Sequence, residues 1–451
     1  MVDARNTVLQ VLNTLDRGHQ TLDGILDAIT ANTIHLSRRD RSLFNALIFG
    51  VLRWRGRLDY IISHFSNTPL KKIEPGVLNI LRLGLFQIIY MDRIPDSAAV
   101  NTAVELTRKI GALRAAGFVN ALLRNAAANY SAVAFPTLKR DPVAFFATAH
   151  SLPAWLARRW NHRYNPETLT ALCNTINAIP PITIRTNTLK ATRQQLMLSL
   201  EGGVEHISPA PHAPDGIIMK KLKRPIPELP AFKNGWFQVQ DEAAQLVSLL
   251  LDPQPGESVL DACAGLGGKT AHLAQLMKNN GNIAAMDKDE KKLQQLGHEM
   301  QRLGISIVRP TCHDLNLTPG TKLRGEFDRI LLDAPCSGLG VVRRNPDIKW
   351  KSDEADLKRH ARVQKRFLEN LVQMIKPYGI LVYAVCSVEP EENEAVVDTF
   401  LKKHPEFVID KSPGKLPITL HSRVEPAAGF KTLPLFNHMD GFYFVRLKRI
   451  K

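Results

Sequence analysis

Residues 261–270 read DACAGLGGKT, a glycine-rich stretch that directly follows the short apolar run SVL at 258–260. A glycine-rich run ending in Gly-Lys-Thr is typical of phosphate-binding loops, whose pattern is G-x-x-x-x-G-K-[ST]. The first glycine of that pattern falls on Cys263, so the pattern fails. The dinucleotide pattern G-x-G-x-x-G fails too, because Thr270 stands where its last glycine belongs. The loop therefore follows a strand but predicts a ligand other than a nucleoside triphosphate.

The rest of residues 236–451 predicts the sheet to which this loop belongs. Short apolar runs alternate with helical runs such as AHLAQLMKN and KRFLENLVQMI; the apolar runs are SVLDA (258–262), NIAAMD (282–287), SIVRP (306–310), RILLDA (329–334) and GILVYAV (379–385). Such alternation indicates a parallel sheet covered by helices on both faces. We expect a doubly wound α/β domain whose ligand lies at the carboxyl ends of the strands.

Acidic residues stand at the ends of four of these strands: Asp261, Asp287, Asp314 and Asp333. Asp287 lies about 20 residues beyond the glycine-rich loop, where an acidic residue accepts hydrogen bonds from ribose hydroxyls. Four carboxylates would repel a triphosphate unless Mg²⁺ intervened. They suit a ligand with hydroxyls, an amine and a cationic centre, which is the character of S-adenosylmethionine. Each aspartate taken alone could instead cap a helix.

The five cysteines are Cys173, Cys263, Cys312, Cys336 and Cys386. Their spacing fits neither a zinc site nor a disulfide framework, so we expect no metal and a reducing, cytoplasmic compartment. Cys336 (LLDAPCSG) and Cys386 (YAVCSVEP) follow neighbouring strands, which places both thiols at one edge of the sheet. A loop cysteine is a candidate nucleophile, whereas Cys173 and Cys312 are interpreted as buried small hydrophobic residues.

The remaining chain lacks the alternating pattern of residues 236–451. Residues 1–145 carry helical periodicity almost throughout, and residues 146–235 predict a small α+β module with a strand near 182–185 and loops near 209–214 and 225–230. The net charge of +16 favours an anionic partner such as nucleic acid. Clustered arginines suit phosphate contact, although each could simply be solvated: Arg38, Arg39, Arg41, Arg53, Arg55 and Arg57. No run reaches the roughly 18 apolar residues of a membrane span.

These residues resemble the RNA cytosine-C5 methyltransferase family, whose signatures are a DxCAAPGGKT loop, a DAPCSG loop and a T-C-S loop. This chain has DACAGLGGKT, DAPCSG at 333–338 and VCS at 385–387. The segment GVVRRNPDIKW (340–350) and the opening helices RNTVLQVL, LFQIIYMDRIPDSAAVNTAVELTRK and GFVNALLRN look like those of bacterial small-subunit rRNA methyltransferases. The resemblance implies a multidomain chain: an all-α NusB-like domain at 1–145, a small α+β linker at 146–235, and a Rossmann-like class I methyltransferase domain at 236–451.

Carried onto this sequence, the resemblance also implies roles. Cys386 would attack C6 of cytosine, which makes C5 able to accept a methyl group, and Cys336 would assist release of the methylated base. Asp333 would contact both the cofactor and the cytosine, with Lys269 in the same pocket. The implied partner is 16S rRNA or a small-subunit assembly intermediate, with cytosine 967 in the usual rRNA numbering as the family's target; a monomer is favoured.

The implied cofactor is S-adenosylmethionine. Asp287 would hold its ribose hydroxyls and Asp314 its adenine amine, while the methionine portion would be wrapped by Cys263, Ala264, Gly265, Leu266, Gly267, Gly268 and Lys269. Two positions depart from the family: Gly265-Leu266 replaces Ala-Pro, which leaves the loop less preorganised, and Val385 replaces the Thr before the second cysteine.

Three other functions compete with this interpretation. A non-catalytic RNA-binding or assembly factor would not need both cysteines and the strand-end aspartates. A nucleoside triphosphatase fails at Cys263. A DNA cytosine methyltransferase would use Cys336 as its nucleophile, but the Cys386 loop and the NusB-like helices argue against it.

Overall fold

The computed structural model of the chain describes residues 3–18, 20–33, 36–318, 326–417, 420, 429–437 and 439–451. The chain forms two compact units: Met1–Ile179 with Val342–Asp353, and Pro180–Val341 with Glu354–Lys451. The glycine-rich loop and both candidate catalytic cysteines lie in the second unit. The domain limits at 145/146 and 235/236 stay predictions. Within the described residues, no helix combines the length and apolar character that crossing a membrane requires.

The first unit consists of helices and connecting loops, which confirms the helical prediction for the start of the chain. In its first helix, Val8, Val11, Leu12 and Leu15 recur at the spacing of one helix face, and all four are buried. The helices are α1 (Ala4–Asp16), α2 (Leu22–Thr33), α3 (Arg38–Phe65), α4 (Pro75–Tyr90), α5 (Asp96–Lys109), α6 (Ala116–Asn129), α7 (Pro142–Thr148), α8 (Ala154–Arg163), α9 (Pro166–Asn177) and α15 (Ile348–Lys351).

A segment from far along the chain, 342–353, completes this helical unit. Lys349 is fully buried, and its Nζ donates to the Arg53 carbonyl at 2.9 Å and to Asn177 Oδ1 at 3.3 Å. Trp350 Nε1 donates to the Leu52 carbonyl at 2.6 Å. In the other direction, Arg53 donates to the Arg343 carbonyl at 2.9 Å. These bonds fix the segment to the middle of α3.

The buried Lys349 gives a first testable prediction. Burial lowers the pKa of Lys349 to about 7, well below its unfolded value of about 10.4. Between these values the unfolded chain binds more protons, so Lys349 makes the unit more stable as pH rises. From pH 7 to pH 9 the free energy of unfolding of the wild type should therefore rise relative to Lys349→Met, by about 1–2 kcal/mol.

Chemical denaturation followed by tryptophan fluorescence measures this difference. Lys71→Met removes an exposed lysine of the same unit and should track the wild type at both pH values. A wild-type advantage over Lys349→Met that stays constant with pH contradicts the argument.

The second unit is built on a mixed sheet. Within the described residues, eight strands form it, in the order β10-β12-β9-β8-β5-β6-β7, with β11 paired to β12. The five strands predicted from the sequence pair in parallel, which confirms that prediction; the antiparallel β10, β11 and β12 were not predicted. The strands are β5 (Ser258–Asp261), β6 (Asn282–Asp287), β7 (Val308–Cys312), β8 (Phe327–Asp333), β9 (Ile375–Val385), β10 (Phe407–Ile409), β11 (Phe430–Thr432) and β12 (Phe442–Arg449).

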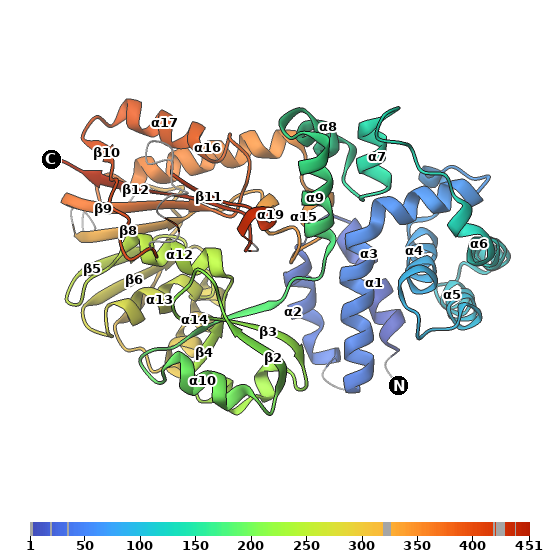
Figure 1. Cartoon of the computed structure of the whole chain (residues 1–451), viewed down its shortest axis with the longest axis horizontal. Helices are drawn as coiled ribbons and strands as arrows, with labels where there is room; N and C mark the ends of the chain where they lie inside the picture. Colours follow the sequence, from blue (N-terminus) through green and yellow to red (C-terminus); the bar gives the residue numbers. More distant parts are fainter. Residues whose placement is uncertain are drawn as a thin grey trace. The chain divides into compact units, whose positions relative to one another are not determined.

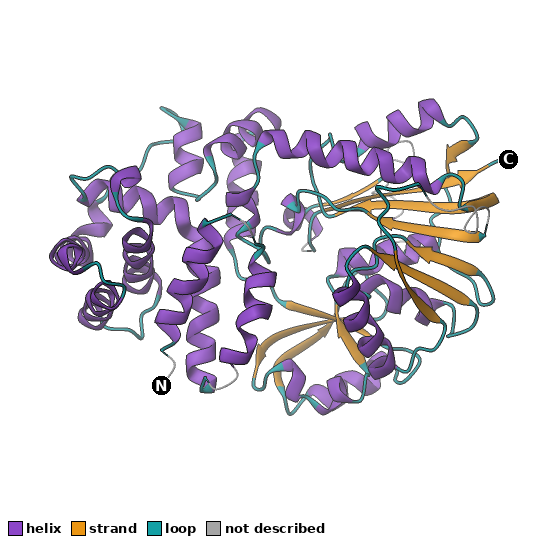
Figure 2. Ribbon diagram, turned by 180° about the vertical axis from the view of Figure 1, so that it is seen from behind, coloured by secondary structure: helices purple, strands orange, loops and turns teal. Residues whose placement is uncertain are grey.

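Helices cover both faces of this sheet, as continuous apolar strands require. Leu331 and Val382 pack with α12, α13 and α14 in one hydrophobic cluster, whereas Leu332 and Tyr383 pack with α16 and α17 in another. Figures 1 and 2 show the two helical layers on opposite sides of the strands. The helices are α12 (Glu242–Leu251), α13 (Gly268–Leu276), α14 (Glu290–Leu303), α16 (Glu354–Leu371), α17 (Glu394–Lys403) and α19 (Pro434–Asn437).

A small antiparallel sheet precedes the large one in this unit. Its four described strands run in the order β2-β3-β1-β4, with bounds β1 (Ile182–Thr186), β2 (Val204–Pro209), β3 (Gly216–Leu222) and β4 (Phe237–Val239). The strand predicted near 182–185 is confirmed as β1. The other three strands were not predicted. Helices α10 (Arg193–Leu200) and α11 (Pro230–Lys233) belong to the same part of the chain.

Candidate active site

The carboxyl ends of the parallel strands meet at one edge of the large sheet. In the strand register, Asp261 pairs with Leu331, Asp287 with Cys312, and Asp333 with Ala384. Parallel strands in register bring the residues that follow them to one side. The loops that carry the predicted site residues therefore start from a common edge.

The glycine-rich loop turns sharply between β5 and α13. Gly265 and Gly267 both adopt left-handed backbone, with φ of +54° and +84°. A Cβ on Gly267 would lie 2.8 Å from Leu296 Cγ, so this glycine lets the loop approach α14 closely. A Cβ on Gly265 would meet nothing within 4 Å, and Leu266 is 54% exposed. The Gly265-Leu266 departure thus lies on the open side of the loop.

Two strand-end aspartates accept hydrogen bonds from backbone N–H groups, and Asp287 does so from the glycine-rich loop as well as from its own loop. Asp287 accepts from the Gly265 N–H at 3.0 Å and from the Asp289 N–H at 2.9 Å. Asp314 accepts from the backbone and side-chain nitrogens of Asn316, and the backbone bond lowers the pKa of Asp314. Both carboxylates are half-buried, so they keep a side open for further donors.

From its place at a strand end, Asp261 is expected to face the ligand with the other aspartates, but the structure places it elsewhere. It is 1% exposed, and its Oδ2 accepts the Thr270 hydroxyl at 2.7 Å. Burial raises the pKa of Asp261 to about 7. The side chain lies beneath the loop and ties β5 to α13, rather than facing a ligand.

Lys269 and Asp333 form an ion pair across the loop, with Nζ 2.5 Å from Oδ2. Burial acts to lower the pKa of Lys269, but the charge of Asp333 and the hydrogen bond to it outweigh this effect and raise it. Lys269 Nζ also lies 5.3 Å from the centre of the Phe442 ring. The lysine is therefore held as an ammonium.

The two candidate catalytic thiols lie side by side, with Cys336 Sγ 3.2 Å from Cys386 Sγ. Both cysteines are free and half-buried. The backbone joins their loops, because the Gly340 N–H donates to the Cys386 carbonyl at 3.0 Å. The hydrogen bond with Cys386, burial and the charge of Glu392 raise the pKa of Cys336 well above its ordinary value. The expectation that neighbouring strand ends bring these thiols together is confirmed.

Comparison with known proteins identifies the family to which this chain belongs. The sequence model of a family described as 16S rRNA methyltransferase RsmB/F matches residues 248–448. The NusB family matches 2–128, and the ferredoxin-like domain of RsmF/B-like methyltransferases matches 152–225. The probable ribosomal RNA small subunit methyltransferase B of Bacillus subtilis (strain 168) is 35% identical over 449 residues, covering 99% of this chain and 98% of the relative. The chain belongs to this RsmB/F methyltransferase family.

Further relatives of this family support the assignment along the whole chain. The ribosomal RNA small subunit methyltransferase B of Vibrio cholerae is 34% identical, covering 96% of this chain and 94% of the relative. The crystal structure of PH0851 has a TM-score of 0.82 at 25% identity and covers 100% of this chain and 99% of its own. That of a methyltransferase homolog protein from Pyrococcus horikoshii has a TM-score of 0.56 at 30% identity, over 67% of this chain and 96% of its own.

The other cysteines and the second departure from the RsmB/F pattern are also placed. Cys173 is buried as predicted. The interpretation of Cys312 as buried is wrong: the cysteine is exposed because it ends β7, the edge strand of the sheet. Val385 is buried in the core.

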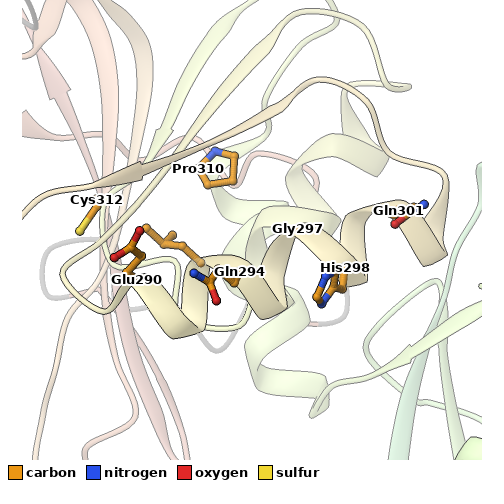
Figure 3. A pocket seen from close by; sticks show the side chains of 8 residues that line it. Glu290, Gln294, Gly297, His298, Gln301, Pro310 and Cys312 are labelled. Carbon is orange, nitrogen blue, oxygen red and sulfur yellow. The ribbon is translucent and has the colours of Figure 1, made fainter.

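Cys312 also lines a shallow pocket on α14 and β7, together with Glu290 and His298 (Figure 3). None of the eight residues that line this pocket is a predicted catalytic or cofactor residue. The pocket is therefore separate from the set of residues that the family pattern assigns to the site.

Sequence reasoning missed Arg185, which supports the glycine-rich loop from the small sheet. Arg185 is 2% exposed and donates to the Gly268 carbonyl at 2.9 Å, to Gln275 Oε1 at 3.3 Å and to Gln238 Oε1 at 3.0 Å. Burial lowers the pKa of Arg185 to about 9. The one sequence signal for Arg185 is that it alternates with Ile184 in the predicted strand. This alternation is equally compatible with an exposed arginine.

The contrast between Gly267 and Gly265 gives a second prediction. Gly267→Ala adds a clash with Leu296 to the strain of a left-handed alanine, and we expect it to lower stability by about 2–3 kcal/mol. Gly265→Ala adds only the strain of about 1 kcal/mol. Thermal denaturation and calorimetry with S-adenosylmethionine should rank Gly267→Ala below Gly265→Ala in both stability and cofactor affinity. Equal losses in the two variants would refute the packing role of Gly267.

Proposed function

We propose that the protein transfers a methyl group from S-adenosylmethionine to C5 of a cytosine in 16S rRNA, through a covalent bond between Cys386 and C6. The observation that carries this proposal is the pair of thiols 3.2 Å apart, at the sheet edge that also bears the glycine-rich loop and the Lys269–Asp333 pair. Cytosine C5 is a poor nucleophile, and addition of a thiolate to C6 makes it reactive. A site with two adjacent thiols can supply the thiolate that adds to C6.

The charges around the two thiols favour Cys386 as the nucleophile. The hydrogen bond with Cys386, burial and the carboxylate of Glu392 raise the pKa of Cys336 well above its ordinary value. A nearby anion disfavours a thiolate, so Cys336 is held as the thiol. The asymmetry supports attack by Cys386 rather than by Cys336, as the alternative drawn from DNA cytosine methyltransferases would have it.

The proposed reaction begins when the Cys386 thiolate adds to the base and ends when it is released. Sγ of Cys386 bonds to C6, and the electron pair of the C5–C6 double bond moves to C5. As C5 bonds to the methyl group, the bond between that methyl and the sulfonium sulfur breaks, and its electron pair stays on the sulfur as a neutral thioether. A base then takes the proton from C5, the double bond forms again, and Cys386 leaves as the thiolate. Cys336 assists this release from its position beside Cys386.

The residues at the strand ends fit S-adenosylmethionine, which supplies an electrophilic methyl group when bound. The carboxylates of Asp287 and Asp314 are half-buried acceptors, suited to ribose hydroxyls and to the adenine amine. Main-chain groups of residues 263–269 would hold the methionine portion, with Lys269 and Asp333 at its reactive end.

The proposed partner is 16S rRNA or a small-subunit assembly intermediate, with cytosine 967 as the family's target. In the arginine cluster of the helical unit, Arg38 and Arg39 are exposed and suit phosphate contact. Arg53 is buried and bonds to the Arg343 carbonyl, so it acts within the fold. Localisation in the cytoplasm and a monomeric state stay predictions.

The cysteine roles make a third prediction. Cys386→Ala should lower methyl transfer by on the order of 10³-fold or more, because the nucleophile is lost. Cys336→Ala should instead accumulate a covalent complex of protein and RNA, visible as a denaturant-resistant band. Bisulfite mapping of small-subunit rRNA, from cells with and without the protein, identifies the cytosine. If Cys386→Ala retains activity and Cys336→Ala abolishes it without trapping RNA, the roles of the two cysteines are assigned wrongly.

The ribose role of Asp287 makes a fourth prediction. Asp287→Ala removes a charged acceptor and should weaken cofactor binding by about 10- to 100-fold in calorimetry. Asp287→Asn keeps one acceptor oxygen and should retain part of the affinity. Unchanged affinity in a folded Asp287→Ala excludes the ribose role.

A further inference from the structure

A fully buried carboxylate, Glu392, lies in the loop that carries Cys386, between β9 and α17, and bonds to the loop that carries Cys336 as well. Its Oε1 accepts from the Ser337 N–H at 2.8 Å and from Gln364 Nε2 at 3.2 Å. Its Oε2 accepts from the hydroxyls of Ser337 and Ser387, each at 2.5 Å. The backbone carbonyl of Glu392 accepts the Tyr383 hydroxyl at 2.6 Å.

These four donors to the carboxylate come from three separate parts of the chain. Ser337 follows Cys336 after β8, Ser387 follows Cys386 after β9, and Gln364 lies on α16, where it also donates to the Pro335 carbonyl at 3.1 Å. Two carboxylate oxygens offer about four acceptor sites, so the acceptor capacity of Glu392 is filled. Burying an ionised carboxylate requires such partners.

Each serine that Glu392 binds is the direct neighbour of a thiol. The hydroxyls of Ser337 and Ser387 lie 3.3 Å apart, and the thiols of Cys336 and Cys386 lie 3.2 Å apart. We propose that Glu392 is a positioning residue, which sets the spacing of the two thiols by binding the serine next to each of them. The proposal rests on the proposed function for the roles of the two cysteines.

The charge of Glu392 gives this role a measurable signature. The groups that interact with the thiol pair are Lys269, Tyr383 on β9, and Glu392, and Asp333 is paired with Lys269. A negative charge beside Cys336 disfavours its thiolate, so removing that charge should let Cys336 ionise at a lower pH. A purely structural residue would not move this titration in that direction.

The test compares Glu392→Gln with the wild type as full-length proteins. Glutamine keeps the shape of the glutamate side chain, but its amide NH₂ replaces one acceptor oxygen and faces the donors that bound that oxygen. We expect the pH at which iodoacetamide alkylates Cys336 half-maximally to fall by about 1 unit or more. With rRNA as substrate, kcat should fall by about 10- to 100-fold because the thiols lose their spacing, while the KM for RNA changes less than about twofold. Mass spectrometry reads each cysteine separately.

The matched control is Glu394→Gln, two residues along. Glu394 is only half-buried and pairs with Lys431, so both its alkylation profile and its kcat should follow the wild type. If Glu392→Gln fails to fold, Ser387→Ala removes one of the four bonds and should lower kcat about 3- to 10-fold without changing cofactor affinity. Wild-type kcat in Ser387→Ala, or a folded Glu392→Gln with an unmoved Cys336 profile, overturns the proposal.

The alkylation profiles do not depend on methyl transfer. A wild-type protein that leaves rRNA cytosine unmethylated refutes the proposed function, whereas the Cys336 profile of Glu392→Gln still decides whether Glu392 acts on the thiols.

Discussion

The parallel pairing of β8 with β9 is the constraint on which the site depends. Register places Asp333 beside Ala384, so the loops that begin after these strands start next to each other. Cys336 and Cys386 are 50 residues apart in the chain, yet their sulfur atoms come within 3.2 Å. Both strands are buried on both faces, and a one-residue slip would move every side chain from one hydrophobic cluster to the other and disrupt the packing of both. The energy that stabilises the sheet therefore also brings the two loops that carry the thiols together.

Buried charged groups hold the loops in fixed positions relative to the sheets. Glu392 joins two cysteine loops and α16, and Arg185 joins the small sheet to the first turn of α13. A buried charge is costly unless it is fully hydrogen-bonded, so each such residue tolerates only one arrangement of its partners. This cost makes these residues useful in a site whose geometry must be held before the substrate arrives.

The sequence predicted the parts of the fold that depend on short-range patterns. Apolar runs gave the five parallel strands, and the residues that follow them gave the aspartates and both thiols. It could not give the partners of Arg185 or Glu392, because their donors and acceptors lie on elements distant in sequence. The same limit explains Cys312: only the strand order shows that β7 is an edge strand and leaves the thiol exposed.

The helical unit also depends on a segment from far along the chain, residues 342–353. The chain leaves the Cys336 loop, enters the helical unit at Val342, and returns at Glu354 to form α16, which carries Gln364. Within the helical unit, Leu52 and Arg53 hold Trp350 and Lys349. The helical unit is thus completed by a segment that continues directly from the Cys336 loop, and removing residues 1–145 would also remove Leu52 and Arg53, which hold that segment. Substitutions in the full chain, rather than truncation, are therefore the way to separate RNA binding from catalysis.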